Sequence, residues 1–224
     1  MQIHQEAPSK SHNIISFVII LALAFILSCI PLLRAPFSWI QTYFHEISHG
    51  IAALLTGGNV DSIQLHLIGS GLCRTIGGIR FIVVFSGYLG AIIWGALIYL
   101  IINNSEKKHA NSLALTLVCM VSISAIFWGR DLITLAIMGI IIIIFLAVLK
   151  LKHNHITDYF LRFLGLYVLL DAIKSPLYLI DGRPYGDGHS LAELTFIPEI
   201  IWIFIWVILG ISVLYFLWRG HIKG

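Results

Sequence analysis

Charged residues are scarce in this sequence. Only 11% of its 224 residues are Asp, Glu, Lys or Arg, whereas 58% are hydrophobic, and the mean hydropathy is +0.93. This composition excludes an ordinary soluble domain and indicates a polytopic membrane protein, in which most apolar side chains face lipid or a neighbouring helix. The formal charge of +3 resides mainly in short connections and forms no basic patch, so we expect the lipid bilayer as a partner and no nucleic acid.

Cysteine is rare, and no two cysteines have a paired spacing. Cys29, Cys73 and Cys119 lie far apart along the chain. This spacing excludes a disulfide framework and a cysteine-type zinc site. A small-residue cleavage site is also missing after the first apolar segment, residues 14–33, which is therefore interpreted as a retained transmembrane helix and not as a signal peptide.

Apolar segments long enough to cross a bilayer recur along the whole chain. They follow a polar tail, residues 1–13, and predict an all-α polytopic membrane protein with six or seven transmembrane helices. We expect one membrane-embedded domain over residues 1–224. The predicted segments are residues 14–33, 37–56, 81–102, 111–127, 132–149, 156–180 and 198–218.

The second apolar segment carries a metal-binding motif. His45-Glu46-Ile47-Ser48-His49 matches His-Glu-x-x-His, in which the two histidines stand one helical turn apart and can hold one ion. Glu46 is about 100° around the helix from His45, close enough to take a proton from an attacking water. The helix is expected over residues 37–56, with Pro36 at its start and Gly57-Gly58 at its end.

The next stretch, residues 60–79, has a different periodicity. Ile63, Leu65 and Leu67 alternate with polar residues, and Gly69-Ser70-Gly71 can turn the chain back into a second strand. We predict a small re-entrant β-hairpin whose edge could pair with an extended peptide; the alternative is a simple extramembrane loop.

A stripe of small residues follows in the segment 81–102. Gly87, Ala91 and Gly95 recur every four residues, which predicts close packing against another helix, in the first place the metal-binding one.

A catalytic zinc needs a third protein ligand, and none stands close downstream of His49. Asp171, Asp181 and Asp187 are the candidates, together with His189. Asp171 can pair with Lys174 three residues later on the same helix face, which gives it a structural explanation. Asp187, in a distal ligand loop at residues 183–196, is preferred, because a glycine-rich break can turn a carboxylate into the bundle.

These motifs resemble those of a known family. The metal-binding helix closed by Thr56-Gly57-Gly58, the segment Ser86-Gly87-Tyr88-Leu89-Gly90 and the Asp187-Gly188 region are similar to the site-2 protease class of membrane metallopeptidases, the M50 peptidases, in their compact M50B-like branch. The resemblance implies that His45, His49 and Asp187 bind zinc, that Glu46 is the catalytic base, and that the hairpin helps to hold substrate. The chain has neither a PDZ-like insertion nor the full asparagine-proline-aspartate-glycine form of the distal motif.

Together these features predict a zinc-dependent endopeptidase embedded in a membrane, with membrane-associated proteins or peptides as substrates. The alternative is a non-proteolytic metal-binding membrane protein, either a transporter or a pseudoenzyme. No internal repeat supports the transporter interpretation. For so compact a chain we expect a multi-pass protein of a prokaryotic inner membrane.

Overall fold

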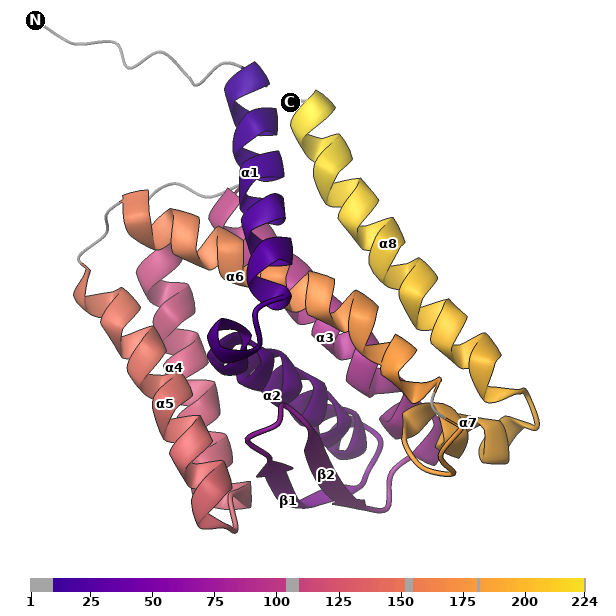
Figure 1. Ribbon diagram of the computed structural model, residues 1–224. Helices are drawn as coiled ribbons and strands as arrows, with labels where there is room; N and C mark the ends of the chain where they lie inside the picture. The colour runs from indigo at the N-terminus through magenta and orange to yellow at the C-terminus, as the bar shows by residue number, and fades with distance from the viewer. Residues whose placement is uncertain (1–9, 104–108, 152–154, 181, 224) are drawn as a thin grey trace, which may run out of the picture.

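The computed structural model describes residues 10–103, 109–151, 155–180 and 182–223 (Figure 1). Eight α-helices, one 3-10 helix and a two-stranded sheet follow in chain order. They are α1 (Lys10–Ser28), α2 (Pro31–Leu55), β1 (Asn59–Leu65), β2 (Gly71–Ile76), α3 (Arg80–Asn103), α4 (His109–Trp128), α5 (Leu132–Lys150), α6 (His155–Lys174), η1 (Ser175–Leu179), α7 (Asp187–Thr195) and α8 (Glu199–Lys223).

Four of the described helices, α3, α4, α5 and α8, are long and apolar enough to cross a membrane. A fifth span results if α1 and α2, which meet at a bend of 107°, count as one broken span. The protein is thus a mainly helical, multi-pass membrane protein with a small sheet, and the larger number of six or seven spans stays a prediction. Residues 1–9 of the predicted polar tail lie outside the described residues, and residues 10–13 are already helical.

The start of the metal-binding helix differs from the prediction. The chain breaks at Cys29 and Ile30, so α2 begins at Pro31 and contains Pro36 in its interior. Pro31 occupies the first helical position, where a missing N–H costs no intrahelical bond. Pro36 lies only just beyond the first turn, where it removes a single bond to the preceding turn and leaves the rest of the helix intact.

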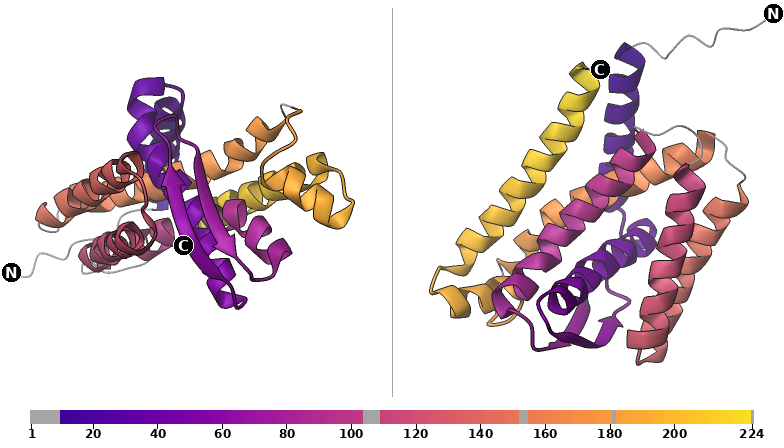
Figure 2. Two further views of the ribbon diagram at one scale, coloured as in Figure 1. Left: turned by 90° about the horizontal axis from the view of Figure 1, so that it is seen from below. Right: turned by 180° about the vertical axis from the view of Figure 1, so that it is seen from behind.

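The β-hairpin is confirmed, although Leu67 belongs to its turn and is largely exposed. Strands β1 and β2 are antiparallel, with Ile63 opposite Cys73 and Leu65 opposite Gly71. Ile63 and Leu65 are buried, as their alternation predicts. The hairpin lies beside α2, at the end of the bundle opposite the start of α1 and the end of α8 (Figures 1 and 2).

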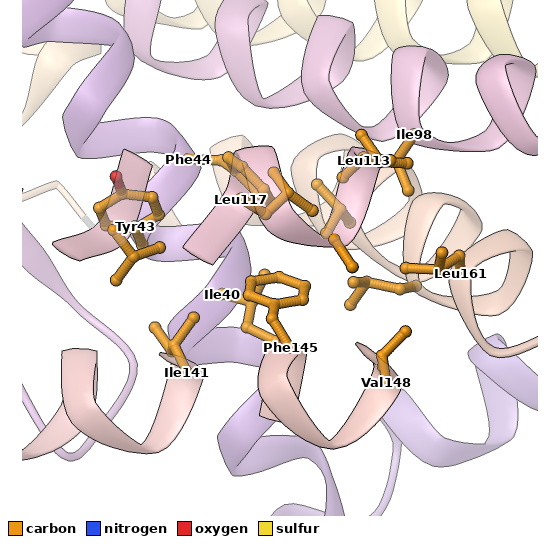
Figure 3. Close-up of a cluster of buried hydrophobic side chains, with 14 of the residues drawn as sticks. Ile40, Tyr43, Phe44, Ile98, Leu113, Leu117, Ile141, Phe145, Val148 and Leu161 are labelled. Carbon is orange, nitrogen blue, oxygen red and sulfur yellow. The ribbon is translucent and has the colours of Figure 1, made fainter. Parts of the chain in front are cut away.

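The largest apolar core surrounds the metal-binding helix. Ile40, Tyr43 and Phe44 of α2 are fully buried against the pair formed by α4 and α5 (Figure 3). The Tyr43 hydroxyl and Ser124 Oγ of α4 are hydrogen-bonded at 2.8 Å. Close van der Waals packing of these three side chains on one face fixes the position of α2.

Helices α3 and α6 cross with their backbones in contact. A Cβ atom added at Gly95 would lie 2.7 Å from the Leu169 nitrogen and 2.9 Å from the Gly165 oxygen. The stripe of small residues on α3 therefore packs against two different helices. Gly95 faces α6, whereas Gly87 at its other end faces the metal-binding helix, as predicted.

Candidate metal centre

The motif histidines lie on one face of α2, as their one-turn spacing requires. His45 Nε2 and His49 Nε2 are 3.1 Å apart, and the side chains are only 13% and 9% exposed. The neighbours Phe44 and Ile47 point to the apolar core and are almost completely buried. Packing on that face therefore determines where the imidazoles point.

Asp187 joins these histidines from the far end of the sequence. Its Oδ2 atom lies 3.0 Å from His45 Nε2 and 3.4 Å from His49 Nε2. The chain enters α7 through Gly186, whose φ of 107° strongly favours glycine, and Asp187 is the first residue of that helix. A tight backbone turn thus directs the carboxylate inward.

These three side chains fit a zinc ion. Their ligand atoms are 3.0 to 3.4 Å apart, and a tetrahedral zinc with bonds of about 2.0–2.1 Å holds its ligands about 3.3 Å apart. Asp187 Oδ2 is buried and accepts no hydrogen bond of normal geometry, despite its closeness to both rings. Burial alone raises the pKa of the Asp187 carboxyl, but His49 and His45 outweigh that effect and hold the pKa below its ordinary value. A carboxylate beside two imidazoles in this way has the chemistry of a cation ligand.

The other candidates for the third ligand do not join this group. Asp171 lies 3.8 Å from Lys174 Nζ, which is the pairing that their spacing predicts. His189 Nε2 lies 3.4 Å from Glu193 Oε1, one turn further along α7. Asp181 lies outside the described residues. Among the described side chains, only His45, His49 and Asp187 form a group of three suitable ligands.

Helix α3 forms the wall behind the imidazoles. A Cβ atom at Gly87 would lie 2.5 Å from the His49 ring and 2.7 Å from the His45 ring, so no larger residue fits there. The Val83 carbonyl oxygen lies 2.7 Å from His49 Nδ1. A hydrogen bond from Nδ1–H to this carbonyl leaves Nε2 free to bind a metal ion.

Glu46, about 100° around the helix from His45, is buried against the hairpin. A Cβ atom at Gly71 would lie 2.6 Å from Glu46 Oε1, and the backbone N–H of Cys73 donates to the Glu46 carboxylate. Burial, with a smaller contribution from Glu46, raises the pKa of the Cys73 thiol to about 12. This thiol stays protonated at neutral pH and does not compete for a metal ion.

A family model described as Peptidase M50B-like matches residues 17–217, nearly the whole chain. The chain belongs to this family. No curated protein and no solved structure matches it. The M50B-like peptidases are a family of membrane peptidases. The apolar helices of this protein and the resemblance of its motifs agree with that assignment.

Several residues around the site of this M50B-like protein carry no signal in the sequence. The Val83 carbonyl and the Cys73 N–H are backbone groups, so their residue types say nothing about their roles. Glu199, in the first turn of α8, lies against Gly188 with a buried oxygen that has no hydrogen-bond partner among the described residues. Nothing in its local sequence distinguishes it from any acid at a helix start.

Proposed function

We propose that this protein is a zinc-dependent, membrane-embedded endopeptidase that hydrolyses peptide bonds of membrane-associated proteins, in the manner of a site-2 protease. The observation that carries the proposal is the group of two imidazoles and one carboxylate whose buried Oδ2 atom has no hydrogen-bond partner, next to the buried acid Glu46. Metal storage alone would not need Glu46 beside the two histidines.

His45, His49 and Asp187 would hold the zinc ion, as two neutral nitrogen ligands and one anionic oxygen ligand. Bound there, zinc would supply Lewis-acid chemistry, polarising a carbonyl and making water more acidic. The three ligands come from two elements held by the apolar core and by α3, so the site is preorganised.

Glu46 would act as the general base. It takes a proton from the attacking water while the new carbon–oxygen bond forms, and it gives that proton to the nitrogen when the carbon–nitrogen bond breaks. The Cys73 N–H and the Gly71 backbone keep the carboxylate in one position.

The substrate would bind as an extended strand beside β2. The outer edge of β1 is already covered, since Ile63 bridges to Gly129 and the Leu65 N–H donates to Thr134 Oγ1 at 2.9 Å. In the described sheet β2 has no further strand neighbour, and its Cys73 N–H reaches Glu46. A peptide that pairs there replaces the helical hydrogen bonds that it loses and arrives next to the base.

The cellular setting that fits this proposal is the inner membrane of a prokaryote, with membrane proteins or peptides as substrates. The apolar helices and the peptidase family support a multi-pass membrane protein.

The first test is zinc stoichiometry in detergent-purified protein. We expect about one zinc per chain in the wild type and in Asp171→Ala, and a loss of zinc in Asp187→Ala. Asp171 is the matched control because it is also an acid of the apolar region and lies outside the ligand group. A wild type without zinc, or zinc content indifferent to Asp187, would favour the transporter or pseudoenzyme interpretation.

The second test addresses Glu46. Glu46→Gln keeps the size of the side chain but cannot take a proton, so we expect full zinc content and a cleavage rate lower by a factor of about 10² to 10⁴. Cleavage of β-casein in detergent micelles is the measurement, because an unfolded substrate needs no unwinding. Cleavage at the wild-type rate by a zinc-loaded Glu46→Gln protein would refute this mechanism.

A further inference from the structure

Tyr88 of α3 packs directly on the candidate metal centre. The centroid of its ring lies 4.4 Å from that of His45, in an edge-to-face arrangement, and 4.7 Å from that of Trp206 in α8. The preceding residue is Gly87, where an added Cβ atom would collide with both imidazoles. The Tyr88 ring is therefore held between the metal-binding helix and α8, where it has little freedom to move.

The hydroxyl of Tyr88 differs from those of the other buried tyrosines. Tyr43 is hydrogen-bonded to Ser124, Tyr99 to His221 and Tyr167 to Ser38, at 2.6 to 3.2 Å. Tyr88 has no hydrogen-bond partner among the described residues, although it is only 9% exposed. Its oxygen is not among the fully enclosed polar atoms, so it borders accessible space. A buried tyrosine hydroxyl normally finds a partner, and here no described residue supplies one, so the hydroxyl is available to a bound molecule.

Three acidic side chains lie near Tyr88. Asp187, Glu46 and Glu199 all lie within electrostatic range of it. None of them accepts its proton in a hydrogen bond, although Glu199 has an unpaired buried oxygen. The O–H group is thus a free donor near one candidate metal ligand, Asp187, and the candidate base, Glu46.

We propose that Tyr88 is a catalytic residue, whose hydroxyl donates a hydrogen bond to the oxygen of the scissile carbonyl as negative charge develops there. The inference rests on the proposed peptidase function. Glu46 approaches from the hairpin side and handles the proton of the water, whereas Tyr88 approaches from α3 and keeps its own proton throughout. Such a donor contributes most when it is preorganised in a site with little water, as this packing provides.

The test is Tyr88→Phe, which retains the ring and its contacts with His45 and Trp206. We expect kcat for β-casein to fall by a factor of about 10² to 10³, with little change in KM and the same zinc content as the wild type. Tyr99→Phe is the matched control, because it removes a buried hydroxyl from the same helix far from the metal centre and should keep the wild-type rate. A zinc-loaded Tyr88→Phe protein with wild-type kcat would overturn the inference, and so would loss of zinc, which would make the hydroxyl part of the metal site.

Binding of a transition-state mimic gives a readout that does not need turnover. An N-phosphoryl dipeptide carries a tetrahedral, negatively charged group, so Tyr88→Phe should weaken its binding to the zinc-loaded protein by a similar factor. Binding of 1,10-phenanthroline, which addresses only the metal, should not change. Equal binding of the phosphoryl dipeptide to the two proteins would overturn the role of Tyr88 even if the wild type cleaved no casein. Absence of cleavage by the wild type would count against the proposed function instead.

Discussion

At the scale of single residues, the candidate metal centre depends on two glycine positions that have no room for a side chain. Gly87 lets α3 approach the two imidazoles, and Gly71 lets the hairpin approach Glu46. Any Cβ atom at these positions would come within 2.5 to 2.6 Å of a functional atom. These two glycines are therefore required because they leave space for the neighbouring element, and not because of their backbone dihedral angles.

Gly87→Ala should abolish zinc binding while the protein still folds. The added methyl group is attached to the backbone of α3 and cannot move away, so it displaces the imidazoles of His49 and His45 from their positions. Zinc content after dialysis against a buffered zinc solution is the measurement, with helical content from circular dichroism beside it. Gly139→Ala in α5 is the control, since a Cβ atom there meets nothing within 4 Å. Retention of zinc with wild-type affinity in Gly87→Ala would contradict the packing argument.

At the scale of elements, the hairpin is positioned by the corner between α4 and α5. Asp131 caps α5 by accepting the Thr134 N–H at 2.8 Å and the Thr134 hydroxyl at 2.7 Å. The same hydroxyl oxygen accepts the N–H of Leu65 in β1. The start of α5 therefore holds β1 in place. Strand β1 in turn pairs with β2, which lies against Glu46.

Thr134→Val should lower cleavage several-fold without loss of zinc. The substitution preserves shape but leaves the buried Leu65 N–H without a partner, at a cost of about 1–3 kcal/mol. The hairpin can then shift relative to Glu46, whereas the three metal ligands keep their own supports. Cleavage rate and zinc content, measured on one preparation, separate the two effects. Thr116→Val on the exposed side of α4 serves as the control, and equal rates for both variants would show that the strand needs no such support.

At the scale of the whole molecule, a polar cluster joins α1 to α6 beside the bend between α1 and α2. Lys174 of α6 donates to Ser28 Oγ at 2.7 Å and pairs with Asp171 at 3.8 Å. Ser28 is the last residue of α1 and donates in turn to the Phe25 carbonyl. This cluster holds α1 on α6 at the point where the chain turns by 107° into the metal-binding helix.

Lys174→Met should destabilise the protein by about 1–3 kcal/mol. This range lies between the cost of breaking a buried ion pair and that of breaking an exposed one, because the two side chains are 27% and 14% exposed. The double variant Asp171→Asn/Lys174→Met should regain part of the loss, since it leaves no unpaired charge. Unfolding in mixed micelles followed by circular dichroism is the measurement, with Lys150→Met, an exposed lysine, as the control. A double variant no more stable than Lys174→Met would show that the charge pairing contributes nothing.

The features that could be read from the sequence are local. The helical spacing of His45 and His49, the alternation of Ile63 and Leu65, and the pair Asp171–Lys174 depend on neighbours at most four residues apart, and the structure has each of them. Local rules failed at the start of α2. Pro31 and Pro36 are both plausible first residues of a helix, and the bend at Ile30 decides between them.

The sequence by itself determined a membrane protein with a metal-binding helix, because hydropathy and helical period are properties of short stretches. Only the tertiary structure decided which distant groups meet that helix. Asp187 lies 138 positions beyond His49. The packing of α3 on α2 brings Tyr88 to His45, and the packing of the hairpin on α2 brings Gly71 to Glu46. Contacts between segments so far apart depend on how whole helices pack, and no local spacing records that packing.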